Sequence, residues 1–108
     1  MSKLVGYWVG VHAGHHGVRT IDNTLEALQK TVGGYIESTT VAQLRDHGIV
    51  IICNEEGVLQ GLDYNINMYP FFFVGDLFLV STGEEDFESL SAEQIEFIER
   101  WIDSLEKE

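Results

Sequence analysis

The spacing of apolar residues near the C-terminus predicts an amphipathic helix over residues 91–107. Apolar positions recur every three or four residues and would form one face of this helix: Ile95, Ile98, Trp101, Ile102 and Leu105. Ser91 suits the N-cap position, and Gln94, three residues later, completes a capping box. Acidic side chains occupy most positions between the apolar ones, so we expect the opposite face of the helix to be charged.

A shorter stretch with the same periodicity predicts a second helix over residues 23–32. Leu28 and Val32 fall on the apolar face at helical spacing. Asn23 is a residue type that caps helix N-termini, and Gly33 can adopt the left-handed conformation that ends a helix. The helix is therefore expected to begin at Asn23 and to end at Gly33.

Runs of β-branched and aromatic residues predict the strands of a sheet. They cover residues 4–11, 18–21, 35–40, 49–53, 58–62 and 71–81, the last bent near Gly75. Asn54 and Gly57 suit a tight turn that pairs the fourth strand with the fifth, and we expect a loop over residues 63–68. The pattern predicts one α+β domain over residues 1–108. It has a mostly antiparallel sheet of about four to six strands, with the two helices in a single layer on the sheet.

The charge of the chain limits its partners. It carries 18 acidic residues against 6 lysines and arginines, a net charge of -12, and ten of the acids lie within residues 84–108. Such a field repels phosphates, so we expect no direct binding of nucleic acid. It would attract basic protein surfaces, including those of DNA-binding enzymes, although solubility is the simpler interpretation of the charge.

Cysteine content and hydropathy indicate where the protein acts. Cys53 is the single cysteine, so no intramolecular disulfide can form, and its place at the end of an apolar strand favours a packed thiol. The chain begins without the apolar run of a signal peptide, and residues 69–80 are too short and interrupted to cross a membrane. We expect a protein of the cytoplasm with no membrane partner. The phenylalanines at 71–73 and Trp101 offer apolar surface that predicts a homo-oligomer.

Sequence motifs of familiar enzymes are missing. The chain contains no Walker loop, no dinucleotide fingerprint, no H-E-x-x-H and no G-x-S-x-G. Glu55 and Glu56 are adjacent on a predicted turn, a position that favours turn formation over acid–base catalysis. We therefore expect a non-enzymatic protein that uses no cofactor and no metal.

The N-terminal segment combines aromatic residues and nitrogen donors with several glycines: Tyr7, Trp8, His12, His15, His16 and Arg19. Three interpretations are open. A metal site would need carboxylate ligands from elsewhere in the fold, and a solvated loop with unrelated histidines is favoured over it. The third is a pocket for a base-stacking, phosphate-bearing ligand, because glycine N–H groups approach phosphates and aromatic rings stack on bases. Asn65 and Asn67 could line the same pocket, although asparagine in loops more often forms turns.

A series of short motifs in fixed order resembles a known family. The series comprises Val32-Gly33-Gly34-Tyr35-Ile36-Glu37, Asn54-Glu55-Glu56-Gly57, Gly61-Leu62, Val74-Gly75-Asp76 and the run from Asp86 to Ser91. It is similar to a small domain of unknown function carried by phages, plasmids and integrative elements, and the resemblance spans residues 21–105. The resemblance implies a mobile-element accessory protein that antagonises host defence. The family has a shorter, basic first strand and a proline-containing turn where this chain has its histidine-rich segment.

Two functional hypotheses follow. The first is a protein that binds and sequesters a small nucleotide-derived molecule through the N-terminal set and the two asparagines. The alternative is an acidic mimic of nucleic acid that binds a basic host protein through residues 84–88 and through Glu93, Glu96 and Glu99. Inhibitory binding to a host protein through the apolar strand over residues 71–74 is a weaker option.

Overall fold

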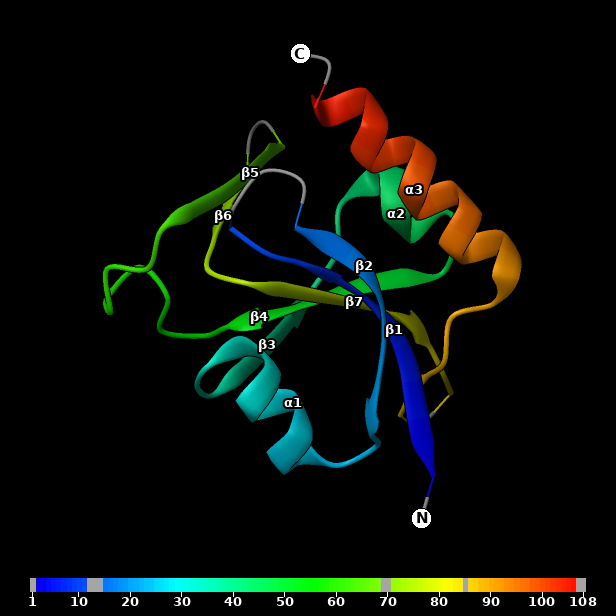
Figure 1. Cartoon of the computed structure of the whole chain (residues 1–108), viewed down its shortest axis with the longest axis horizontal. Coiled ribbons are helices and arrows are strands. Elements are labelled where there is room, and N and C mark those ends of the chain that lie inside the picture. The colour runs from blue at the N-terminus through cyan, green and yellow to red at the C-terminus, as the bar shows by residue number, and fades with distance from the viewer. Residues whose placement is uncertain (1, 12–14, 69–70, 85, 107–108) are drawn as a thin grey trace.

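The computed structural model describes residues 2–11, 15–68, 71–84 and 86–106. The elements, in chain order, are β1 (Lys3–Val9), β2 (His16–Asp22), α1 (Leu25–Val32), β3 (Ile36–Thr39), α2 (Ala42–Arg45), β4 (Ile49–Asn54), β5 (Tyr64–Met68), β6 (Phe71–Val74), β7 (Leu77–Thr82), β8 (Phe87–Glu88) and α3 (Ala92–Glu106). Figure 1 shows how they are arranged in space.

The main sheet has the strand order β2-β1-β7-β4-β3, and β8 pairs with the end of β7. Every pair of neighbouring strands that the structure describes is antiparallel. Strands β5 and β6 form a separate two-stranded sheet, which extends beside the main one in Figure 1. The predicted α+β class, the mostly antiparallel sheet and the two main helices are confirmed.

The helices cover both faces of the main sheet, so the expected single layer of helix is corrected. On β4 and β7, Ile51 and Leu79 pack toward α2 and α3, whereas Ile52 and Phe78 pack toward α1. Successive side chains of a strand point to opposite faces, and here both sets are apolar and fully buried. A strand that is covered on both faces carries apolar side chains on both, so its sequence shows no alternation of apolar and polar residues. For this reason the sequence did not indicate that helices cover both faces. Figure 1 shows α1 on one side of these strands and α3 on the other.

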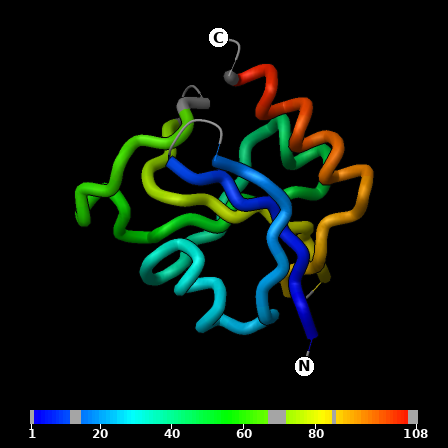
Figure 2. Tube along the Cα trace, in the orientation of Figure 1, coloured from blue at the N-terminus to red at the C-terminus, as the bar shows by residue number. Residues whose placement is uncertain are grey.

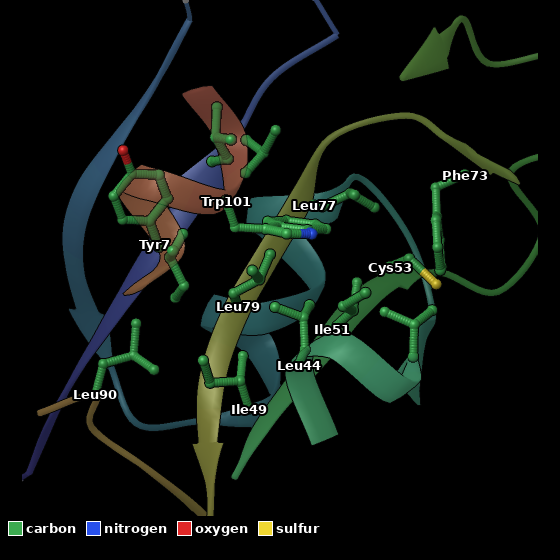
Figure 3. Packing of buried hydrophobic residues seen from close by; sticks show 14 residues of the cluster. Tyr7, Leu44, Ile49, Ile51, Cys53, Phe73, Leu77, Leu79, Leu90 and Trp101 are labelled. Carbon is green, nitrogen blue, oxygen red and sulfur yellow. The ribbon is translucent and has the colours of Figure 1, made fainter. Parts of the chain in front are cut away.

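Helix α3 follows the predicted amphipathic pattern. Ile98, Trp101 and Ile102 are buried, and Figure 3 shows the Trp101 indole beside Leu77 and Leu79 of β7. The capping box forms as expected, because Ser91 N–H donates to Gln94 Oε1 at 2.9 Å and Gln94 N–H donates to Ser91 Oγ at 3.2 Å. The side-chain amide of Gln94 also donates to the carbonyl of His47 at 2.9 Å, so the cap anchors α3 to the loop after α2.

Helix α1 begins one residue later than predicted. Thr24, not Asn23, is the N-cap, and its Oγ1 accepts a hydrogen bond from Ala27 N–H at 3.1 Å. Gly33 ends the helix in the left-handed conformation at φ 81°, as its residue type predicts. Leu28 is buried against the second face of the sheet.

The middle of the chain departs most from the prediction. Residues 55–61 form successive turns instead of the return strand expected over 58–62, while the expected loop at 63–68 contains β5. The turns form because Asn54 Oδ1 accepts Glu56 N–H at 2.8 Å and Gln60 N–H bonds to the Glu56 carbonyl at 2.8 Å. The predicted strand over 71–81 is two strands in different sheets, separated at Gly75, whose φ is 75°. In Figure 2 the chain leaves the main sheet after β4 and returns to it at β7.

Candidate functional site

The predicted N-terminal ligand set lies on the β1–β2 hairpin but is divided between its two faces. Cross-strand partners share a face, and the register places Val9 opposite His16 and Gly6 opposite Arg19. Tyr7, two residues before Val9, therefore shares the α3 side of the sheet with His16. Trp8 shares the α1 side with Arg19. No single surface of the described hairpin presents the whole set.

Tyr7 is a core residue. It is 1% exposed, and its hydroxyl lies 2.8 Å from Nδ1 of His16, with which it shares a hydrogen bond. The two rings also stack at a centroid distance of 5.9 Å. His15 is exposed, and His12 lies outside the described residues. The pair of Tyr7 and His16 joins β1 to β2 on the buried side of the hairpin.

The opposite face carries a cation–π contact. The Arg19 guanidinium carbon lies 4.2 Å from the centroid of the Trp8 ring, and Arg19 remains exposed. The indole N–H of Trp8 is buried without a hydrogen-bond partner among the described residues. A Cβ added at the neighbouring Gly17 would meet no atom within 4 Å, so open space adjoins this contact.

The two asparagines do not join this set. The Asn65 side-chain amide donates to the Val9 carbonyl at 3.0 Å and to the Gly75 carbonyl at 2.7 Å. Asn65 thereby connects β5 to the end of β1 and to the bend before β7. Asn67 lies in β5 opposite Phe72, and its side chain is outside the description.

Helix α3 presents a row of carboxylates to solvent. Its exposed acids include Glu93, Glu96, Glu99 and Asp103, which lie on the side opposite the buried stripe, and Arg100 forms an ion pair with Glu96. With a rise of about 1.5 Å per residue, the four charges extend over about 15 Å, or about 5 Å from one to the next. One strand of DNA carries a phosphate about every 3.4 Å along its axis. The row is thus less densely charged than one DNA strand, and Arg100 neutralises one of its four charges.

An open acidic depression precedes α3 in the chain. Its volume is about 670 Å³, and it is lined by Thr82, Gly83, Glu84, Asp86 and Glu88. The described lining contains three carboxylates and no basic side chain. This segment extends the negative surface beyond the helix.

A groove of about 300 Å³ lies beside β3 and β6, and it is lined by β3 with the two residues after it, the end of β4 with the turns after it, and β6. Its lining combines acids, hydroxyls and apolar side chains: Glu37, Thr39, Thr40, Val41, Cys53, Asn54, Glu55, Gly57, Val58, Phe72, Phe73 and Val74. We did not predict this site from the sequence, because its lining comes from three separated segments. In addition, Val58 was expected to begin a strand but lies in the turns after β4. One signal in the sequence could have indicated the groove. Glu37 lies opposite the buried Cys53, so an acidic residue of β3 shares a face of the sheet with an apolar one.

Cys53 forms part of the groove floor as a protonated thiol. Burial raises its pKa to about 11, and the negative charge of Glu37 adds to the effect. The thiol donates a weak hydrogen bond to the Glu37 carbonyl, with 3.7 Å between sulfur and oxygen, and Figure 3 shows it beside Phe73. A thiol that remains protonated at neutral pH is a poor nucleophile.

The raised pKa of Cys53 predicts a pH dependence of stability. The folded thiol ionises near pH 11 and the unfolded thiol near pH 9, so the free energy of unfolding should fall as pH rises through this window. After allowance for solvent screening, the loss should be about 1–2 kcal/mol, and below pH 9 this thiol should contribute none. Urea denaturation of the wild type and Cys53→Ala between pH 8 and pH 11 measures the difference. Parallel pH profiles for the two proteins would contradict the prediction.

Among the described residues, no three His, Cys, Asp or Glu side chains come together as a possible metal site. In the same part of the chain, no helix combines the length and the apolar character needed to cross a membrane.

Comparison with known proteins identifies a family alone. A family profile described as a domain of unknown function, DUF3846, matches residues 9–104. Neither a curated protein nor a solved structure matches the chain.

Proposed function

Because the chain belongs to the family DUF3846, whose description assigns no activity, we propose a function from its surface. The protein is a non-enzymatic accessory protein of a mobile element that binds a basic host protein by imitating nucleic acid, and so antagonises host defence. The observation that carries this proposal is the exposed row of carboxylates on α3.

The fold favours this use of the helix. The buried stripe of Ile98, Trp101 and Ile102 holds α3 on the sheet, so its acidic face is presented on a rigid support. Of the 18 acids of the chain, ten lie within residues 84–108, so the field is strongest at this end. Such a field steers a basic partner toward the helix and would compete with a phosphate backbone for the same site in the host cytoplasm.

Affinity capture at two salt concentrations tests the proposal. The immobilised chain should recover a basic protein from cell lysate at about 50 mM salt and release it when salt is raised to about 200 mM or more, because each ion pair replaces condensed counterions. A variant with Glu93→Lys, Glu96→Lys and Glu99→Lys should recover none of it.

A charge-matched control separates local from global charge. The substitutions Glu26→Lys, Asp46→Lys and Asp63→Lys change the net charge equally at exposed acids outside α3. This control should retain capture. If both variants lose the partner equally, only net charge matters and α3 is not the binding surface.

A second candidate function is the sequestration of a small nucleotide-derived molecule. The contact between Trp8 and Arg19 favours it, because an exposed guanidinium on an aromatic ring, beside open space at Gly17, offers a phosphate a partner and a base a stacking surface. Calorimetric titration with cyclic nucleotides and ADP-ribose derivatives tests it. Saturable binding that Arg19→Ala abolishes would support this function, and a flat titration would exclude it for these ligands.

A further inference from the structure

The groove beside β3 and β6 combines acidic residues with exposed apolar side chains, and it is separate from the acidic face of α3. The acidic residues Glu37 and Glu55 line it, whereas no lysine, arginine or histidine is among the described residues that line it. A phosphate would be repelled there, and a cationic group would be attracted. The charge complementarity of the groove therefore points to a positively charged occupant.

The mouth of the groove exposes apolar side chains. Val58 is 68% exposed and Phe72 is 60% exposed, although both line the groove. Leu59, next to Val58, is 86% exposed, and Tyr64, the cross-strand neighbour of Val74, is 57% exposed. Exposed apolar side chains beside polar residues are typical of protein interaction sites. The occupant should accordingly carry apolar groups beside its positive charge.

The adjoining strand offers a place for an extended chain. Strand β3 ends the main sheet and has a strand partner on one side only within the described residues. An edge strand can accept an additional strand through its free backbone groups. The volume of about 300 Å³ matches one long side chain with part of its neighbours. A small ligand alone would leave the exposed apolar rim and the free edge uncovered.

We propose that this groove binds an extended basic–apolar segment of a protein partner, with a lysine or arginine side chain near Glu37 and Glu55 and an adjacent apolar side chain against Val58 and Phe72. This inference rests on the proposed function in one respect, namely that the partner is a basic protein. It adds a second contact surface, on a different part of the molecule from the acidic face of α3.

Short synthetic peptides test the inference with the full-length chain. The first has a central arginine flanked by phenylalanine and valine, the second replaces the arginine by glutamate, and the third keeps the arginine but has serine flanks. Isothermal calorimetry and amide shifts in ¹⁵N–¹H correlation spectra report affinity and location. We expect the first peptide alone to bind saturably and to shift the amides of Glu37, Thr39 and Val58. Binding of the third peptide as tight as that of the first, or shifts confined to α3, would overturn the inference.

Paired variants make the test specific to the groove. Phe72→Ser should weaken the first peptide by about tenfold or more, while Leu25→Ser, which removes a similarly exposed apolar side chain from α1 on the opposite face of the main sheet, should leave its affinity unchanged. Joint substitution of Glu37→Gln and Glu55→Gln should weaken it to a similar extent, against Glu26→Gln as the control. Equal effects of the groove and control variants would refute the site.

The outcomes separate the two proposals. The substitutions Glu93→Lys, Glu96→Lys and Glu99→Lys should change the affinity of the first peptide by less than about threefold at physiological salt, since the groove is not on α3. If the peptide does not bind but capture through α3 persists, the groove inference alone fails. If the peptide binds in the groove but no basic partner depends on α3, the proposed function fails and the groove remains.

Discussion

Replacing Phe78 with alanine is expected to lower the free energy of unfolding by about 3–5 kcal/mol. Phe78 is fully buried in β7, the central strand of the main sheet, and packs with Leu28 and Val32 of α1. Its ring also fills the space above Gly6, where an added Cβ would lie 2.3 Å from Phe78 Cζ. The substitution therefore leaves a cavity between sheet and helix that the rigid strands cannot close. Urea denaturation followed by circular dichroism measures the loss.

Two comparisons qualify this prediction. Phe87→Ala removes the same side chain from a half-buried position in β8, at the edge of the same cluster, and should cost clearly less. Gly6→Ala alone should destabilise by about 1–3 kcal/mol because the new methyl group collides with the ring of Phe78, and less in the Phe78→Ala background. A loss below about 1.5 kcal/mol for Phe78→Ala would show that α1 collapses onto the sheet after all.

Asn54→Ala is expected to cost about 2–4 kcal/mol, because it leaves two backbone groups without their partner. Asn54 is buried, and its amide donates to the Val32 carbonyl at 3.4 Å while its Oδ1 accepts Glu56 N–H at 2.8 Å. The same amide donates to Gln60 Oε1 at 3.1 Å across the turn. These bonds connect the end of α1 to the turns at residues 55–61, which wall the groove. Urea denaturation and amide hydrogen exchange at Glu56 measure the effect.

Aspartate is the informative control at this position. Asn54→Asp retains the oxygen that accepts Glu56 N–H and loses the amide that bonds to Val32 and Gln60. It should slow exchange at Glu56 relative to Asn54→Ala. A cost below about 1 kcal/mol for Asn54→Ala would mean that water replaces all three bonds.

Local signals in the sequence predicted the helices well. The caps of α3 are made by Ser91 and Gln94, three residues apart, and Gly33 ends α1 through its own backbone freedom. The apolar stripe of α3 is equally a matter of spacing along the chain. Each of these features depends on residues within a few positions, so it is visible without knowledge of the fold.

The wrong predictions came from runs of residue types that were assigned to strands without the hydrogen bonds and side-chain directions that decide between a strand and a turn. Strand β6 pairs with β5, the strand directly before it, and the turn after Asn54 forms because Asn54 Oδ1 accepts Glu56 N–H two residues later. Residue periodicity shows neither contact. The candidate site shows the same limit. Tyr7 and Trp8 are adjacent in sequence, but the alternation of β1 places them on opposite faces. The alternation of side chains along a strand is enough to predict that the N-terminal set is divided between two faces. It does not predict the groove, because three separate segments of the chain line it.

Competition with DNA for the captured partner tests the central claim most directly. A labelled DNA duplex is bound to the purified basic partner, and increasing amounts of this chain are added at fixed salt. If α3 imitates a phosphate array, the wild type displaces the duplex, and the Glu93→Lys, Glu96→Lys and Glu99→Lys variant needs at least about tenfold more protein to do so. If the partner holds the chain and the duplex at the same time, or if the variant displaces the duplex as well as the wild type, the account is contradicted.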